Sequence, residues 1–152
     1  MAKSVAFIDS EIGVEDKKIY DLGAVRSDRS EYHGTSAQDF CTFISEADFL
    51  CGHNIVHHDM KFLAPYLGAK ADFPCIDTLY VSPLLFPQRP YHRLLKDDKL
   101  QSDELNNPLN DAKKAEKLFY DEVSAFQRLS SAQKQIFCCL NIQFHIFSLI
   151  CI

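Results

Sequence analysis

The sequence predicts a single α/β domain. The chain has 152 residues, of which 47% are apolar, and this length and composition suit one folded unit with its own core. Runs rich in β-branched and aromatic residues alternate with runs of helical periodicity, which is the pattern of an α/β fold. Together these observations argue against a disordered chain and against a small disulfide-stabilised one.

Five segments are expected to form strands, because β-branched and aromatic residues dominate them and polar, turn-forming residues separate them. The first has VAFI at its centre and ends at Asp9, as expected of a buried central strand. The first three segments follow one another through short polar breaks, which predicts an antiparallel meander. The five segments are residues 4–9, 18–26, 31–35 and 49–55 and the run CIDTLYV after Pro74.

Two helix starts are marked by capping residues. Ser36 precedes a stretch that places Phe40, Phe43 and Ile44 on one face. Asn107 can cap free amides and Pro108 suits the first helical position, so a helix is expected from there to about Leu129. The other expected helices are residues 57–67, a short segment that Pro87 ends, and a helix from Ser131 onward; residues 88–107 are expected to form a long polar loop.

The chain divides into a main domain, residues 1–129, and a C-terminal apolar helix, residues 130–152. The apolar tail is interrupted by Asn141 and Gln143 and is too short for a good membrane span, so no membrane partner is expected. The helix either packs into the core or presents a face that docks another domain or a second copy of the chain.

Charge and cysteine usage narrow the function classes. The formal net charge of −5 argues against a protein that holds nucleic acid by a broad basic surface. The six cysteines form no CxxC pair and the N-terminus lacks an export signal, so we expect buried thiols in a reducing, cytoplasmic compartment.

Four acids are expected to converge on one site. Asp9 and Glu11 are two residues apart at the end of the first strand, so their side chains point to the same side. Asp59 begins the helix after the fourth strand, and Asp111 lies in the first turns of the helix after Pro108. The presence of any one of these acids needs no functional explanation, because a single acid is commonly just solvated or interacts favourably with a helix dipole. Four crowded carboxylates, however, repel one another unless cations neutralise them, and such oxygen ligands suit Mg²⁺ or Mn²⁺ and phosphodiester hydrolysis.

The segments around these acids resemble the three exonuclease motifs of the DnaQ-like DEDD family in order and spacing, over roughly residues 4–128. The segments are FIDSEIG (7–13), CGHNIVHHDMKFL (51–63) and NNPLNDAKKAEKLF (106–119), and CIDTLYVSPLLFP (75–87) resembles the family's Asp-Thr-Leu segment. The resemblance implies a ribonuclease H-like fold with a mixed five-stranded sheet, three antiparallel strands followed by parallel ones, flanked by helices. It also implies a 3′-to-5′ exonuclease acting on single-stranded 3′ ends, with DNA favoured over RNA. Two Mg²⁺ or Mn²⁺ ions would be held by the catalytic residues Asp9, Glu11, Asp59 and Asp111.

A second resemblance is narrower. The segment YHRLLKDDKLQSDELNNPLNDA (91–112) is similar to the exonuclease domain found ahead of RecQ-type helicases in some bacteria. It implies that the apolar tail from Ile136 continues into, or docks on, a helicase module.

The chain departs from the family pattern at the general base. Asn106 and Asn107 occupy the positions of the family's His or Tyr, and an amide cannot accept a proton from water at neutral pH. Three outcomes follow: His92 on the long loop substitutes as base, the metal activates water without a protein base, or the domain binds ends and cuts slowly or not at all. A positioned base contributes roughly 100-fold to 10,000-fold. The alternative function is therefore a weak or inactive module that binds nucleic-acid ends or a helicase.

The substrate contacts implied by the resemblance flank the acids. Ser10, Ile12 and Gly13 would approach the terminal nucleotide, with Ile12 against its base. His53 and Asn54 would support the site and the substrate strand, although a buried histidine with hydrogen-bond partners is an equally good interpretation of His53.

Two further features of the sequence remain open. His58 is expected to pack against its neighbours, with metal contact as the alternative. Four cations on the long loop suit phosphate contacts or belong to a solvated loop, because acids offset them; these cations are Arg89, Arg93, Lys96 and Lys99.

Overall fold

The computed structural model describes residues 3–68, 72–94 and 107–139. Within these ranges five strands form one mixed sheet in the order β3-β2-β1-β4-β5. β1 is antiparallel to β2, and β2 to β3, whereas β4 runs parallel to β1 and β5 parallel to β4. The predicted α/β class and mixed five-stranded sheet are confirmed. The strands are β1 (Val5–Ile12), β2 (Ile19–Arg26), β3 (Glu31–Gly34), β4 (Phe49–Gly52) and β5 (Cys75–Asp77).

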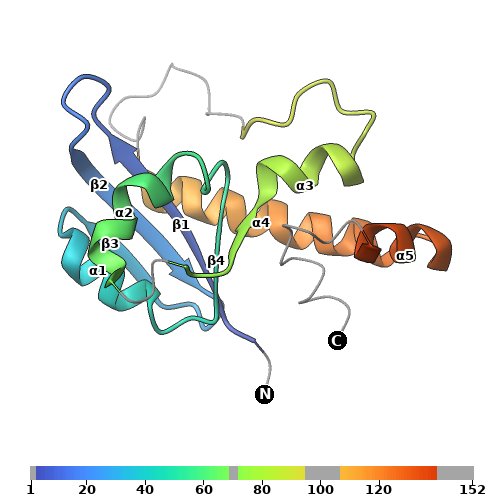
Figure 1. Cartoon of the computed structure of the whole chain (residues 1–152), viewed down its shortest axis with the longest axis horizontal. Helices are drawn as coiled ribbons and strands as arrows, with labels where there is room; N and C mark the ends of the chain where they lie inside the picture. The colour runs from blue at the N-terminus through green and yellow to red at the C-terminus, as the bar shows by residue number, and fades with distance from the viewer. Residues whose placement is uncertain (1–2, 69–71, 95–106, 140–152) are drawn as a thin grey trace.

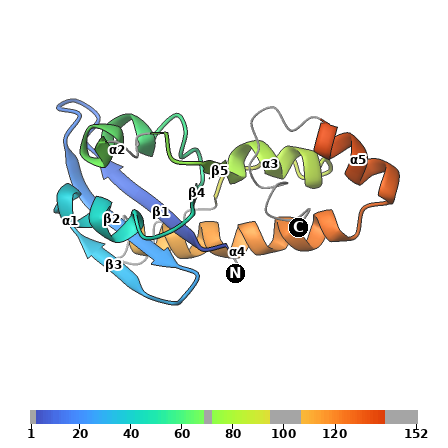
Figure 2. The ribbon, with the colours of Figure 1, turned by 60° about the horizontal axis from the view of Figure 1, so that its bottom comes forward.

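Helices cover both faces of the sheet. α1 and α2 pack on one face, where Phe40 and Leu63 share an apolar cluster with Ile8. α3 and α4 pack on the other, where the ring centroids of Phe7 and Phe119 lie 5.4 Å apart. Figure 1 shows the long α4 crossing behind the strands, and Figure 2 shows the same arrangement from below. Within the described ranges the helices are α1 (Ala37–Ile44), α2 (Asp59–Leu67), α3 (Thr78–Leu85), α4 (Pro108–Gln127) and α5 (Ser131–Cys139).

The alternation of β1 decides which face carries the acids. Ala6 and Ile8 belong to the cluster beneath α1 and α2, whereas Phe7 belongs to the cluster beneath α4. Because side chains alternate with a period of two, Ser10 continues the first set and Asp9 the second. The carboxylates of β1 therefore lie on the face that α4 covers.

Both predicted capping residues begin helices as expected. The Ser36 hydroxyl accepts a hydrogen bond from the Asp39 amide at 3.3 Å. The Asn107 side-chain oxygen accepts hydrogen bonds from the Leu109 amide at 3.0 Å and the Asn110 amide at 3.4 Å, with Pro108 as the first helical residue. These contacts satisfy amides that have no partner within their own helix.

The fourth and fifth strands are shorter than predicted. We expected the run CIDTLYV to be extended, but β5 ends at Asp77, because its carboxylate accepts a hydrogen bond from the Leu79 amide at 3.0 Å and caps α3. β4 ends at Gly52 instead of continuing to residue 55, and Asn54 adopts a positive φ of 70°. Both differences come from a turn that the side chain of Asp77 stabilises.

The C-terminal helix begins at Ser131, as predicted, and the Phe137 ring packs against Phe126 at 6.1 Å. The rest of the apolar tail, residues 140–152, lies outside the described residues, as do residues 95–106 of the long loop. Helices within the described ranges do not combine the length and apolar character needed to cross a membrane. Cys41 and Cys51 are buried free thiols, and burial raises the pKa of Cys51.

Candidate metal centre

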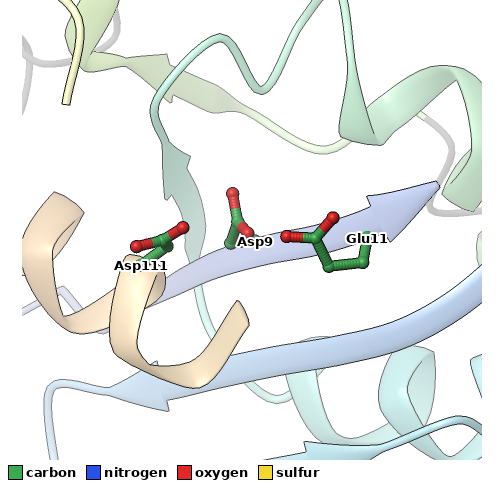
Figure 3. A group of neighbouring side chains, drawn as sticks. All are labelled: Asp9, Glu11 and Asp111. Carbon is green, nitrogen blue, oxygen red and sulfur yellow. The ribbon is translucent and has the colours of Figure 1, made fainter. Parts of the chain in front are cut away.

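Three of the predicted acids meet at the end of β1. Asp9, Glu11 and Asp111 each offer a carboxylate oxygen, and among the described residues these oxygens lie within 4.8 Å of one another. Figure 3 shows the carboxylates of Glu11 and Asp111 on either side of Asp9. All three side chains are half-buried. Clustered carboxylate oxygens are the ligands that Mg²⁺ and Mn²⁺ prefer, so this group could hold a metal ion.

A close backbone contact brings Asp111 to the other two acids. Gly23 on β2 is the register partner of Asp9. A Cβ atom at Gly23 would lie 2.0 Å from the Leu109 nitrogen and 2.3 Å from the Pro108 carbonyl carbon. Only glycine therefore lets the first turn of α4 rest on β2 beside Asp9, and Asp111 is carried by that turn.

A lysine already contacts the acid group. The Lys114 ammonium lies 3.1 Å from the Asp111 Oδ1 atom, one turn further along α4. It offsets part of the repulsion among three neighbouring carboxylates. A divalent cation at Asp111 would compete with this contact.

Asp59, the fourth predicted ligand, lies outside the group of three. Its side chain is only 2% exposed, and its Oδ1 atom accepts a hydrogen bond from the Ser10 hydroxyl at 2.5 Å. His58 Nδ1 lies 3.7 Å from the same oxygen. The buried carboxylate of Asp59 therefore has a protein partner on the α2 side of the sheet.

The acid group opens into a cavity of about 480 Å³. The cavity lies at the C-terminal ends of the parallel strands, where open α/β sheets commonly bind ligands, and its volume suits a small molecule such as a nucleotide. Ser10, His53 and Asn54 were predicted to contact substrate, and all three line it. The other lining residues are Asp9, Glu11, His58, Leu79, Arg93, Leu94 and Asp111.

The remaining predicted substrate contacts lie beyond the cavity. Ile12 and Gly13 are described by the structure but are not among the lining residues. β1 shifts register between Glu11 and Ile12, and the Gly13 amide donates a hydrogen bond to the Lys18 carbonyl at 2.8 Å. The Gly13 amide is therefore engaged in the β1–β2 hairpin.

His53 has hydrogen-bond partners on both ring nitrogens. Nε2 accepts from the Leu94 amide at 3.3 Å, so Nδ1 carries the hydrogen and donates to the Thr78 hydroxyl at 2.9 Å. Thr78 in turn donates to the Gly52 carbonyl at 3.3 Å. Burial lowers the pKa of His53, which favours this neutral form. His53 is therefore half-buried with partners on both ring nitrogens, and it also lines the cavity.

Asp77 stabilises the loop that carries His53 and Asn54. Its two carboxylate oxygens accept hydrogen bonds from the Asn54 amide at 2.8 Å and the Val56 amide at 3.2 Å. Asp77 is buried, and these bonds fix the positive φ of Asn54. The Asp-Thr-Leu segment thus acts as a support beneath the site.

Sequence reasoning did not assign four of the lining residues to this cavity: His58, Leu79, Arg93 and Leu94. The adjacency of His58 to Asp59 was a usable signal, and the nearby Asp59 carboxylate raises the pKa of His58. Arg93 was noted only as part of a basic loop.

His92, the proposed substitute for the general base, is not among the residues that line the acid cavity. His92 lines a neighbouring cavity of about 310 Å³ together with Arg89, Arg93 and Lys114. Its Nδ1 atom is buried and has no hydrogen-bond partner among the described residues. Asn107 caps α4, and Asn106 lies outside the described residues.

Comparisons with known proteins add no identification: no family model, curated protein or solved structure matches this chain. The functional assignment therefore rests on the sequence motifs and on the geometry of the acid group.

Proposed function

We propose that the chain is a metal-dependent 3′-to-5′ exonuclease domain of the DnaQ-like DEDD family with a ribonuclease H-like fold, and that it acts on single-stranded DNA ends. One observation carries the proposal: three carboxylates converge within 4.8 Å in a nucleotide-sized cavity. Such a concentration of negative charge is costly without a cation. Phosphodiester hydrolysis is the reaction that a cation at this position best serves.

Asp9, Glu11 and Asp111 would hold one Mg²⁺ or Mn²⁺ ion, and Asp59 would contribute to a second. When bound, two such ions lower the pKa of an attacking water and stabilise the leaving 3′ oxygen. Asp59 is buried beside Ser10, so it would have to exchange the Ser10 hydroxyl for a cation. The stoichiometry of Mn²⁺ binding tests this point: we expect two ions in the parent and one in Asp59→Asn, and a single ion in both would refute the second site.

The remaining lining residues suit a terminal nucleotide. Arg93 places a guanidinium at the cavity, where it can form a bidentate contact with a phosphate. Leu79 and Leu94 offer apolar surface to a sugar or base. The hydrogen bond from the Leu94 amide to His53 Nε2 ties the loop that carries Arg93 and Leu94 to the end of β4.

A second candidate function is an end-binding module that cleaves weakly and docks on a helicase. The observation in its favour is that the Asn107 side chain is used to cap α4 and cannot act as a base. Asn106→His tests whether a missing base limits the reaction, because it would restore the residue that the family carries. We expect a higher rate, with Asn106→Ala as the control that leaves the rate unchanged. An unaltered rate in a folded Asn106→His variant would count against the missing-base explanation.

The decisive experiment is degradation of a 5′-labelled single-stranded oligonucleotide in Mn²⁺, Mg²⁺ and EDTA. The parent should give a metal-dependent ladder that shortens from the 3′ end. Asp9→Asn should abolish the ladder, whereas Asp121→Asn, an exposed acid on α4, should not. Metal binding without cleavage would favour the end-binding module, and equal activity in Asp9→Asn and the parent would refute the metal assignment.

A further inference from the structure

A second concave surface lies on the α2 side of the molecule. It encloses about 660 Å³ between the β1–β2 hairpin, the start of α1 and the exposed face of α2. We call it the lysine groove, because its lining includes Lys17, Lys18 and Lys61 together with Phe62 and Tyr66. None of these residues belongs to the acid cavity.

The lysine groove is positive in an otherwise acidic chain. All three lysines are exposed, and no carboxylate is among the described residues that line the groove. The formal net charge of the chain is −5, so this concentration of cations is local. Lys18 forms a long, exposed ion pair with Asp16, in which the ammonium lies 3.9 Å from the carboxylate. A negatively charged ligand is therefore the expected occupant.

The hairpin holds two of these lysines in place. Asp16 accepts hydrogen bonds from the Lys18 amide at 3.2 Å and from the Tyr20 hydroxyl at 2.8 Å. The Lys17 amide donates to the Gly13 carbonyl at 3.1 Å, and Lys17 has a positive φ of 56°. The backbone is thus fixed by local contacts while the ammonium groups remain exposed, which limits the entropy lost on binding.

The start of α1 adds to the positive character of the groove. Ala37 and Gln38, the first two helical residues, line it beside the N-cap Ser36. The first amides of a helix have no acceptor within that helix, and the positive end of its dipole lies there. Together with the three lysines this end of α1 favours phosphate oxygens.

A row of rings on α2 joins the acid cavity to the lysine groove. His58 lines the acid cavity, and its ring lies 6.3 Å from that of Phe62, which lines the groove. Tyr66 follows four residues later and is 47% exposed. Residues four apart lie on one helix face at a rise of about 6 Å. His58 and Phe62 are half-buried, so the exposed Tyr66 ring is the one best placed to stack against a base.

We propose that the lysine groove binds the sugar-phosphate backbone of the substrate strand upstream of its 3′ terminal nucleotide, with Tyr66 stacking on a base. The proposal rests on the proposed exonuclease function for the position of the 3′ end. The lysines contact phosphates and supply affinity without reading sequence. A strand long enough to leave the acid cavity is held at two places, whereas a mononucleotide ester is held only at the first.

The test compares a long and a short substrate in the same variants. The triple variant Lys17→Gln, Lys18→Gln, Lys61→Gln is assayed on an oligonucleotide of about ten nucleotides and on the p-nitrophenyl ester of thymidine 5′-monophosphate. We expect kcat/KM for the oligonucleotide to fall by about 10-fold to 100-fold at low salt, with the ester unaffected. A matched triple variant at Lys3, Lys113 and Lys117, which do not line the groove, should change neither. Equal losses on both substrates, or none, would overturn the proposal.

Binding without cleavage separates this proposal from the catalytic one. In EDTA, fluorescence anisotropy of the same oligonucleotide should show weaker binding to the triple variant. The slope of log affinity against log salt should become less steep by about 2, since each phosphate contact on a single strand contributes about 0.7. Tyr66→Ala should weaken binding about 10-fold, and Tyr66→Phe should restore it. If the parent binds through the lysine groove but never cleaves, the proposed exonuclease activity is refuted while the proposed strand binding by the groove is supported. Unchanged binding in the triple variant would refute strand binding by the groove.

Discussion

The two ends of α4 carry carboxylates in opposite surroundings. At its N-terminal end Asp111 joins Asp9 and Glu11 in an open cavity, and all three are half-buried. Three turns further along, Glu122 is fully buried and contacts Ser82 of α3. Its Oε1 atom accepts a hydrogen bond from the Ser82 hydroxyl at 2.7 Å, while Oε2 has no partner among the described residues. Burial raises the pKa of Glu122 from 4.5 to about 8.

The comparison shows that one helix can place carboxyl groups in two environments that favour opposite protonation states. A single carboxyl in an apolar setting avoids the cost of burying its charge by keeping a proton. A group of acids in an open cavity, with the positive end of a helix beside it, can keep its charge for a cation. Only the N-terminal end of α4 is therefore suited to metal binding.

The largest expected effect is on metal affinity, which should depend on the acid at the N-terminal end of α4 and not on Glu122. Asp111→Asn removes one of three ligand carboxylates, so we expect Mn²⁺ affinity to fall by more than about 100-fold. Glu122→Gln should leave it unchanged. Calorimetric titration with Mn²⁺ measures both, and a comparable loss in Glu122→Gln would break the comparison.

The second effect separates the ends by the pH dependence of stability. Between pH 4.5 and about 8 folded Glu122 holds a proton that the unfolded chain has lost. The contribution of Glu122 to the free energy of unfolding is thus fully present below that window and is lost as pH rises through it, by up to about 1.4 kcal/mol per pH unit. Glu122→Gln should remove this slope, so its stability relative to the parent should increase from about pH 5 to about pH 9. Urea unfolding at both pH values tests this, with Asp121→Asn as the control that keeps the slope.

A third, smaller effect tests whether the first turn of α4 positions Asp111. Asn107→Ala removes the side-chain cap and should lower the free energy of unfolding by about 1 kcal/mol. Because the same turn carries Asp111, Mn²⁺ affinity should also fall, while the pH slope assigned to Glu122 persists. A loss of stability with unchanged Mn²⁺ affinity would show that the cap does not position the ligand.

The smallest effect concerns the cation already at the site. Lys114→Met removes the ammonium 3.1 Å from Asp111. Since partly exposed ion pairs contribute at most about 1 kcal/mol, Mn²⁺ affinity should rise by only about 3-fold. A fall in affinity would mean that Lys114 supports the carboxylate instead of competing with a metal.

The sequence was sufficient wherever a feature depends on neighbouring residues. Ser36 and Asn107 were predicted as caps because a capping side chain bonds amides only two or three residues ahead. Asp9 and Glu11 were predicted to share a face because strand alternation is a local property. The same local logic applies to Asp77, whose carboxylate caps α3 through the Leu79 amide and ends β5, but it could not predict the bonds of Asp77 to the Asn54 and Val56 amides, which come from a distant loop.

Long-range packing decided the rest of the candidate site. Whether the Asp59 carboxylate faces a cavity or Ser10 depends on how α2 sits on the sheet, which no local pattern encodes. Arg93 lines both the acid cavity and the neighbouring one, whereas His92, beside it on the same loop, lines only the neighbouring cavity. Glu122 resembles any helical acid in the sequence, and its burial follows from the packing of α4 against α3, where Ser82 contacts it.

The contact between Gly23 and the first turn of α4 has a consequence for mutational scanning. Gly23 carries no functional group, yet any Cβ atom there would overlap the backbone at Pro108 and Leu109 and displace the turn that holds Asp111. In a saturation library scored for activity, position 23 should therefore tolerate as few replacements as the acids themselves. An intolerant glycine outside the cavity would be the genetic signature of a site whose spacing is set by backbone contact.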